Sequence, residues 1–406
     1  MSLVPAFTAL KAATTSTIHS KPTNSGPQMN QRLRITHKLV ATAAIAAAVA
    51  ATTACGDLPT TASDAASQSS AKVVSEPFEG RPSINDFCGQ KPIQVALADG
   101  FGGNSLRKIM RRQFELEAAK CPNITKTFYT DANADPQKYA SDISGLVAQG
   151  VNAIITLDDF GPAALPALRK ATQAGVVVVP YKSNPGGTPG SDYEVFVSED
   201  SDAVGKEWAD WASEVTGGTG DVAMLGGTPG NALSTAFLDG YKKAAPQGLK
   251  LIQNDPITTN WTIAGMQQAV SGMLTQHPDT KLLLADYGAT IPAIARAYQA
   301  AGKPLVPLAV TASSNEVGCA WKDLKAKNPG FELLSVDGTG NVPKIALRKA
   351  VAAAQGLKDP ESPLVKLSVF IDTKNGKMPT CNPALPPDAD LSADLTPEQM
   401  KAVFAR

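Results

Sequence analysis

From residue 91 onward, the chain alternates short apolar runs with longer segments that repeat apolar residues every three or four positions. The first pair is the run KPIQVALA at 91–98, followed by helical spacing over 105–120. Continuous apolar runs of this length indicate buried strands, and a period near 3.6 indicates amphipathic helices. Strands separated by helices pair in parallel, because a parallel connection needs about a dozen residues or more. This alternation restricts the chain to an α/β fold with parallel sheets.

The same pattern continues for more than 200 residues. The predicted strands are 91–98, 124–131, 151–157, 176–180, 193–198, 221–227, 249–255, 280–286 and 306–310. The predicted helices are 105–120, 136–149, 162–174, 201–215, 232–245, 262–276 and 290–301. Gly150, Gly175 and Gly302 follow three of these helices, as expected for residues that end a helix in the left-handed conformation.

The number of predicted strands favours two lobes over one sheet, with a break near 198–200. The sequence has 406 residues, of which 43% are apolar and 18% charged, which is ordinary for a globular protein. A disordered chain would have fewer apolar residues and more net charge. No run of 18 strongly apolar residues occurs, which excludes a protein that crosses the membrane several times.

The first 54 residues are predicted to be a signal peptide, with Met29 as a possible true start. They contain five Lys or Arg residues and no Asp or Glu. After Met29, three basic residues precede the apolar stretch 39–50, in the order of a secretory signal. That stretch is too short to span about 30 Å of hydrocarbon. We therefore expect export.

The segment that ends this region, Thr52-Thr53-Ala54-Cys55, resembles the lipobox of bacterial lipoproteins, with Thr52 where leucine is usual. The resemblance implies cleavage before Cys55 and attachment of diacylglycerol to its sulfur. The following residues are rich in Ser, Thr and Ala without apolar periodicity, so 55–77 is predicted to be a lipidated N-terminus and flexible tether.

Four further cysteines remain for the body of the chain. An even number outside the cytoplasm favours two disulfides, for which three pairings exist. Cys88 and Cys121 each precede a predicted strand, and adjacent parallel strands would bring them together. We therefore favour Cys88–Cys121 with Cys319–Cys381, against the alternative of four buried free thiols.

Charge and histidine content exclude several classes of protein. Residues 55–406 carry a net charge of about −5, opposite in sign to a typical nucleic-acid binder. His277 is the one histidine beyond residue 54, which argues against histidine-based catalysis or metal binding. No CxxC spacing occurs. We expect no metal, no cofactor and no nucleic-acid partner.

Over residues 91–358 the sequence resembles the type I periplasmic sugar-binding proteins, the ribose- and galactose-binding group of transporter receptors. The order and spacing of several phrases carry this resemblance. They are IQVALADGFGGNSLRKIMRRQFELEAAK, TDANADPQKYASDISGLVAQGVNAIITL, SDYEVFVSEDSDAVGKEWADWASE, GGTGDVAMLGGTPGNALSTAFLDGYKKA and TTNWTIAGMQQAVSGMLTQHPDTKLLLAD.

The resemblance implies two Rossmann-like lobes joined by a three-crossover hinge, with the ligand between them. On this pattern the N-terminal lobe is 78–197 plus 338–358, and the C-terminal lobe is 199–337 plus 362–375. The Pro-rich tail 376–406 departs from the family. The implied function is a monomeric, membrane-anchored receptor that delivers a sugar or polyol to the permease and ATPase of an ABC importer. No enzymatic activity is implied.

In open parallel sheets, ligands bind beyond the carboxyl ends of the strands. That rule selects polar side chains that can bracket a hydroxyl and aromatic rings that can cover the apolar face of a sugar. The candidate ligand-binding residues are Asp99, Phe101, Asn104, Leu106, Arg107, Asp158, Asp159, Tyr181, Lys182, Asn231, Trp261, Asp286, Tyr287, Ser313 and Asp337.

The resemblance sharpens some of these candidates and weakens others. Asn104 and Arg107 match hydroxyl-binding positions of the family, and Trp261 matches its aromatic residue. The acidic-basic pair after the fourth strand is replaced by Tyr181-Lys182, without the carboxylate. These departures preserve the architecture and leave the sugar open, including a ligand with a cationic group.

Three other interpretations compete with a transport receptor. The segment GFGGNS follows a strand as in dinucleotide-binding enzymes, but lacks the third glycine and an acidic residue at the end of a strand about 20 positions later. The adjacent carboxylates of Asp158 and Asp159 suggest an extracytoplasmic hydrolase, although neighbouring residues usually point in different directions. A receptor for a nucleoside, an amine or a signal molecule could instead report to a membrane sensor.

Overall fold

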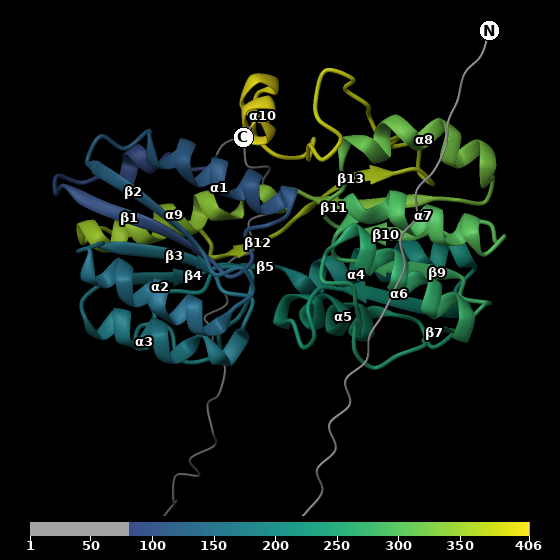
Figure 1. Ribbon diagram of the computed structural model, residues 1–406, viewed down its shortest axis with the longest axis horizontal. Coiled ribbons are helices and arrows are strands. Elements are labelled where there is room, and N and C mark those ends of the chain that lie inside the picture. The colour runs from purple at the N-terminus through teal and green to yellow at the C-terminus, as the bar shows by residue number, and fades with distance from the viewer. Residues whose placement is uncertain (1–80, 406) are drawn as a thin grey trace, which may run out of the picture. The chain divides into compact units, whose positions relative to one another are not determined.

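The computed structural model describes residues 81–405, which are coloured in Figure 1. The predicted signal peptide, the lipid attachment at Cys55 and the tether up to residue 77 lie outside the described residues. No described helix is both long enough and apolar enough to cross a membrane.

The first lobe is a parallel sheet of four described strands. In spatial order they are β2 (Ile124–Asp131), β1 (Ile93–Asp99), β3 (Ala153–Leu157) and β4 (Val177–Pro180). Its helices are α1 (Ser105–Ala118), α2 (Pro136–Ala148), α3 (Leu165–Gln173) and α9 (Val342–Gln355). The chain thus returns to this lobe for α9 after it has built the second one (Figure 1).

Side chains of β1 alternate between the two faces of this sheet. Val95 and Leu97 belong to the core that includes α1 and α9, whereas Ala96 and Ala98 belong to the core under α2 and α3. Both sets are fully buried. A strand covered on both faces must be apolar throughout, which is the continuous pattern seen in the sequence.

The second lobe is built around a larger sheet. Its main path is β13 (Ser368–Asp372), β11 (Leu333–Asp337), β10 (Leu308–Val310), β9 (Leu282–Ala285), β6 (Gly220–Gly226) and β7 (Leu249–Leu251), with β8 (Ile257–Thr258) also paired to β6. Its helices are α4 (Ser201–Thr216), α5 (Ala232–Ala244), α6 (Ile263–Gln276), α7 (Ile291–Ala300) and α8 (Asn315–Lys327). The strands pair in parallel except β13, which is antiparallel to β11.

Helices α4 and α5 pack closely because two glycines face each other. A Cβ atom on Gly205 would lie 2.1 Å from the backbone carbon of Gly240. Trp208 of α4 fills the neighbouring space against Phe237 of α5, with ring centroids 5.6 Å apart. Trp208 and Trp211 are buried, as the helical spacing of these residues predicts for core positions.

Three crossovers join the lobes. The first contains β5 (Ser198–Glu199) and the third contains β12 (Leu364–Val365), and these short strands pair in parallel. The second follows β11 and contains the 3₁₀ turn η4 (Thr339–Asn341). The predicted fold class, two parallel-sheet lobes with a three-crossover hinge, is confirmed. The lobe boundaries drawn from the sequence stay predictions.

Both favoured disulfides are confirmed. Cys88 follows the 3₁₀ turn η1 (Ile84–Phe87) and bonds Cys121, with Cα atoms 5.6 Å apart. Cys319 of α8 bonds Cys381, with Cα atoms 4.6 Å apart. The second bond ties the C-terminal tail to α8, and the tail then ends in helix α10 (Pro397–Phe404).

The predicted strand at 193–198 is wrong. Only Ser198 belongs to a strand, while Val197 forms an isolated bridge with Tyr181. This segment follows a turn-rich loop, and Tyr193 packs into the core under α2 and α3 and forms only an isolated bridge, with Pro189. The helix predicted at 162–174 is divided into η2 (Gly161–Ala163) and α3. Gly150, Gly175 and Gly302 have positive φ, which confirms them as helix ends.

Candidate functional site

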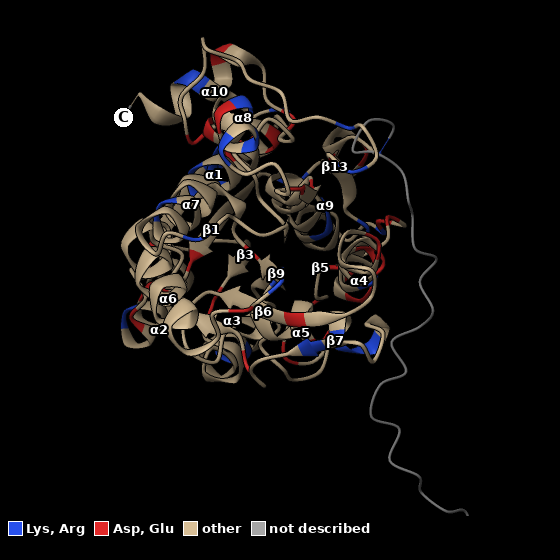
Figure 2. Ribbon diagram, turned by 90° about the vertical axis from the view of Figure 1, so that its right-hand side faces the viewer, with Lys and Arg blue, Asp and Glu red and all other residues tan. Residues whose placement is uncertain are grey.

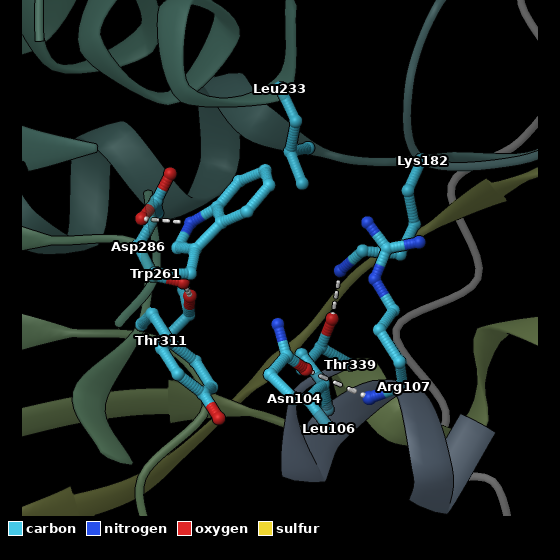
Figure 3. A pocket seen from close by; sticks show the side chains of 10 residues that line it. Asn104, Leu106, Arg107, Lys182, Leu233, Trp261, Asp286, Thr311 and Thr339 are labelled. Atoms are coloured by element: carbon cyan, nitrogen blue, oxygen red, sulfur yellow. Dashed lines mark hydrogen bonds between the residues drawn. The ribbon is translucent and has the colours of Figure 1, made fainter. Parts of the chain in front are cut away.

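The carboxyl ends of the strands in both lobes face a shared pocket (Figure 3). Its walls enclose about 380 Å³, part of which is open to solvent. The lining residues are Asn104, Leu106, Arg107, Lys182, Leu233, Trp261, Asp286, Tyr287, Thr311 and Thr339. They come from both lobes and from the second crossover, so a molecule held here would contact both lobes and that crossover.

Arg107 is the centre of a buried charge network on the N-terminal side. It lies in the first turn of α1, where the Asn104 side chain caps the helix by accepting from the Arg107 amide. Its Nη1 donates to Asp99 Oδ1 at 2.6 Å, and its Nη2 donates to both oxygens of Asp159 at 2.6 and 2.8 Å. Asp99 ends β1 and Asp159 follows β3, so the parallel pairing of these strands places both carboxylates beside α1.

Burial and the guanidinium act in opposite directions on the pKa of each carboxylate. Burial raises the pKa of Asp99 to about 6, and the Arg107 charge opposes that rise. Burial also raises the pKa of Asp159, again against Arg107. For Arg107, burial acts to lower the pKa, but the charges of Asp159 and Asp99 outweigh it and raise the pKa overall. The guanidinium therefore stays charged and paired with two carboxylates.

Lys182 links the pocket to two crossovers. It follows β4, and its Nζ donates to Glu199 Oε1 of β5 at 2.6 Å and to the Thr339 hydroxyl of η4. Thr339 in turn donates to Glu199. Lys182 and Glu199 side chains are 5% and 0% exposed, so this is a buried ion pair. A ligand that touches Lys182 would contact a group fixed to both crossovers.

On the C-terminal side, Trp261 is held by its polar edge. Its Nε1 donates to Asp286 Oδ1 at 2.9 Å, and Ser234 donates to the other Asp286 oxygen. Gly227, at the end of β6, makes room for the ring, because a Cβ there would lie 2.2 Å from Trp261 Cζ2. The indole is thus fixed beside the pocket before any ligand arrives (Figure 3).

Asp286 is a buried acceptor. Burial raises the pKa of Asp286 to about 6, opposed by the hydrogen bonds from Ser234 and Trp261. The next residue, Tyr287, reaches across the pocket, and its hydroxyl lies 2.7 Å from Ser105 Oγ of α1. Phe101 also approaches Trp261, with ring centroids 6.5 Å apart. These contacts join the two lobes directly at the pocket.

Unusual backbone conformations concentrate around this site. Among residues 81–405, the non-glycine residues with positive φ all lie in loops that follow strands. They include Asp159, Lys182, Trp261 and Ala312, whose φ values are between 50° and 62°. Such conformations cost of the order of 1 kcal/mol or more each and persist where the surroundings enforce them. Their position here is typical of a binding site.

The structure separates the sequence-predicted residues into three groups. Those that line the pocket are Asn104, Leu106, Arg107, Lys182, Trp261, Asp286 and Tyr287. Those that contact a lining side chain from behind are Asp99, Phe101 and Asp159. Those that lie outside the lining are Asp158, Tyr181, Asn231, Ser313 and Asp337.

Residues of the third group have other partners. Asp158 accepts from the amides of Phe160 and Gly161, and burial raises its pKa to about 7, helped by the Asp159 charge. Ser313 donates to Asp337 at 2.8 Å. Tyr181 is fully buried. Asn231 caps α5.

Sequence reasoning did not single out several residues that the structure places at the site. Thr311 directly follows the strand predicted at 306–310 and Thr339 lies near a predicted crossover, but neither was chosen. Leu233 lies in the first turn of α5, beyond the loop that follows the strand. Glu199, an acidic residue at the predicted break between lobes, was a signal for the Lys182 ion pair.

The described residues offer no group of three or more His, Cys, Asp or Glu side chains placed to hold a metal ion. Asp158 and Asp159 also lack the arrangement of a paired acid and base. Asp158 binds backbone amides of its own loop, while Asp159 binds Arg107. What the pocket offers instead is hydrogen-bonding groups and an indole ring, which suits reversible binding.

The chain belongs to the family described as periplasmic binding protein domain, whose model matches residues 96–358. Members of this family are substrate-binding proteins of transport systems. The type I periplasmic binding protein family that the sequence resembles is thus confirmed.

The individual relatives have low sequence identity to this chain. The ribose import binding protein of Bacillus subtilis is 25% identical over 196 residues, which cover 48% of this chain and 62% of that protein. Two solved structures share the fold at 19% and 21% identity, with TM-scores of 0.60 and 0.59. They are the arabinose transporter component of Shewanella sp. ANA-3, covering 68% of this chain and 91% of that one, and the Caulobacter myo-inositol binding protein, covering 70% and 95%.

Proposed function

We propose that this protein binds a small neutral sugar or polyol between its lobes and delivers it to the permease and ATPase of an ABC importer. The observation that carries the proposal is the indole of Trp261, fixed by Asp286, which faces a pocket whose other lining residues are mostly polar and come from both lobes. A sugar ring has apolar C–H faces that pack on an aromatic ring and hydroxyls that both donate and accept hydrogen bonds. Hinge closure would bury it.

The charges around the pocket favour a neutral ligand. Each described cation that lines it, Arg107 and Lys182, is already paired with a buried carboxylate. Four described carboxylates lie in or behind the walls, against these two cations. They belong to Asp99, Asp159, Glu199 and Asp286. An anionic sugar would therefore meet repulsion without a free cation to bind. An amine is the alternative that this excess leaves open.

The names of relatives support the same class of ligand. The curated relative is a ribose import binding protein, and the solved structures hold L-arabinofuranose and myo-inositol. The chain covers only 62% of the curated relative's length, so its ligand and partners belong to this proposal.

The remaining parts of the proposal concern location and assembly. Family membership and the two described disulfides support an extracytoplasmic location. We further propose a cleaved signal over 1–54, a lipid on Cys55 and a tether to residue 77, on the sequence pattern alone. We propose a monomer without enzymatic activity, with lobe boundaries as predicted from the sequence. A sensing role would require a different membrane partner.

A thermal-shift panel tests the proposal. The purified protein is melted with sugars, polyols, nucleosides, amino acids and betaines at millimolar concentration. A ligand of micromolar affinity at that concentration stabilises the folded state by about 4 kcal/mol, which is a clear shift. We expect stabilisation by a sugar or polyol. Stabilisation by a nucleoside or an amine alone would overturn the ligand class and keep the fold.

Replacing Trp261 with Ala tests the site itself. We expect binding of the best ligand from the panel to weaken by about 1–3 kcal/mol, or roughly 5- to 150-fold, through lost contact with the ring. The matched control is Trp321→Ala in α8. The Trp321 ring does not line the pocket and packs on Phe331, with ring centroids 5.5 Å apart. Calorimetry measures both. Equal dissociation constants for Trp261→Ala and the parent would remove Trp261 from the site.

A further inference from the structure

The C-terminal segment 381–404, which we call the interlobe strap, contacts both lobes in succession. It leaves the second lobe after β13 and ends as α10 beside α1 of the first lobe. Figures 1 and 2 both show α10 next to α1. Its contacts fall into three parts along the chain.

The first part is anchored to α8 of the C-terminal lobe. The Cys319–Cys381 disulfide fixes the start of the strap covalently. Asn315, the first residue of α8, donates from its backbone to Ala389 O at 2.7 Å, and its side-chain amide donates to Asn382 O at 2.9 Å. Gly318 allows this close approach, since a Cβ there would lie 1.8 Å from Thr380 O.

The middle of the strap holds the second crossover. Ser392 Oγ accepts from the backbone of Gly338 at 3.1 Å, and the Asp394 backbone donates to Asn341 Oδ1 at 2.9 Å. The turn between Gly338 and Asn341 contains Thr339, which lines the pocket. The strap therefore contacts the hinge at a turn that also lines the pocket.

The last part is anchored to the N-terminal lobe. Met400 and Val403 of α10 are buried against Ile109 of α1. Gln113 of α1 donates to Asp394 O at 3.1 Å, and Lys344 of α9 pairs with the Asp394 carboxylate at 2.6 Å. The anchors at the two ends thus lie on α1 and α8, and each of these helices begins within a few residues of the pocket.

We propose that the interlobe strap restrains opening of the hinge and holds the protein nearer its closed form. Opening moves one lobe relative to the other, while the strap is a covalent chain docked on both. Wide opening must therefore undock α10 from α1 or pull the strap off the crossover, and both steps expose buried side chains. This device does not depend on the identity of the ligand. Its consequence is a smaller open population and slower release of whatever the pocket holds.

The test cuts the strap after the protein has folded. A protease recognition sequence is inserted between Pro387 and Asp388, which are exposed and lie between the Cys319–Cys381 disulfide and the strap's contacts with the second crossover and α1. Nitroxide labels on Gln173→Cys and Gln276→Cys, exposed positions in the two lobes, report the interlobe distance by pulsed electron resonance without ligand. We expect the longer-distance population to rise on cleavage from about a tenth or less to the major fraction.

A matched cut serves as the control. The same sequence inserted between Asn375 and Gly376, in the exposed turn before the strap, leaves the strap tied to α8 through the Cys319–Cys381 disulfide. Cleavage there should leave the distance distribution unchanged. In the background Cys319→Ser with Cys381→Ser, the same cut should shift it toward longer distances.

Two results would overturn the proposal. One is an unchanged distribution after complete cleavage between Pro387 and Asp388, with circular dichroism showing an intact fold. The other is equal opening by the control cut while the disulfide is intact. Neither readout involves a ligand, so failure of the proposed sugar-binding function would leave this test unaffected.

Discussion

The two sides of the pocket are built from different chemistry. The N-terminal side presents charges that are already paired, with Arg107 between Asp99 and Asp159 and Lys182 on Glu199. The C-terminal side presents the indole of Trp261 and the hydroxyl of Thr311, with Asp286 holding the indole in place.

This difference assigns different tasks to the lobes. A buried charge network is rigid and costly to disturb, since each charge depends on its partner. It can offer fixed hydrogen-bond donors and acceptors, but it adapts poorly. An aromatic wall contributes mostly through burial and contact area. We infer that the N-terminal side fixes the orientation and charge class of the ligand and that the C-terminal side supplies most of the affinity.

The largest expected effect is on the N-terminal side. Replacing Arg107 with Met should lower the free energy of unfolding by about 3–5 kcal/mol, because two buried carboxylates lose their counter-charge. Urea denaturation at pH 7 measures it. The loss should be smaller at pH 5, since burial has already raised the pKa of Asp99 to about 6 and protonation removes its charge.

The control for this change is Arg111→Met, one turn further along α1. The Arg111 side chain is 39% exposed and pairs with Glu115 at the surface, a type of pair worth about 0–1 kcal/mol. A loss below about 1 kcal/mol for Arg107→Met would contradict the view of the N-terminal side as an interdependent network.

A smaller effect is expected from crowding the aromatic wall. Replacing Gly227 with Ala places a methyl group 2.2 Å from Trp261 Cζ2, so the ring must move. Overpacking of this kind costs about 1–3 kcal/mol. We expect weaker ligand binding and an altered tryptophan emission spectrum.

In α6 of the same lobe, Gly272→Ala meets no neighbouring atom and should leave binding unchanged. Because Ala is more stable than Gly inside a helix, this variant should gain about 0.5–1 kcal/mol in stability. Unaltered affinity in Gly227→Ala would show that the fixed position of the indole is unimportant.

The smallest effect concerns the charge of Asp286. Its pKa is raised to about 6 when folded, so the folded state binds this proton more tightly than the unfolded state. Stability therefore falls as the pH rises from about 4 to about 6 and the penalty is complete above that window. Asp286→Asn should remove this slope and gain roughly 1–2 kcal/mol at pH 7.5, with no gain at pH 4.

Thermal melts across pH follow this prediction, with the exposed Asp202→Asn as the control. A stability gain that is independent of pH would contradict the assignment to the Asp286 charge. A loss of stability at pH 7.5 would show that the charged hydrogen bonds to Trp261 and Ser234 outweigh burial.

Local patterns predicted most of the fold. The period of apolar residues located β1 and α1, and Gly150, Gly175 and Gly302 marked helix ends where only a left-handed conformation continues the chain. The strand predicted at 193–198 was wrong because alternating apolar residues also occur in loops whose side chains pack one by one into a core. Helices α8, α9 and α10 and strand β11 were not predicted.

The site was only partly predictable, because its chemistry depends on pairings distant in sequence. The strand-end rule found Arg107, Trp261 and Asp286. It could not show that Arg107 binds Asp159, 52 residues away, or that Lys182 binds Thr339, 157 residues away. These partners determine which charges are free for a ligand. Spacing along the chain carries no signal for such contacts.

The most direct test of the central claim is a charge series measured by calorimetry. The best neutral sugar from the panel is compared with its uronic acid and its amino sugar, which share one ring skeleton. Because the cations of the pocket are already paired, we predict that the neutral sugar binds at least about tenfold more tightly than the uronic acid, or 1.4 kcal/mol. Equal or tighter binding of the uronic acid would contradict the account, since it would require Arg107 or Lys182 to leave its carboxylate partner.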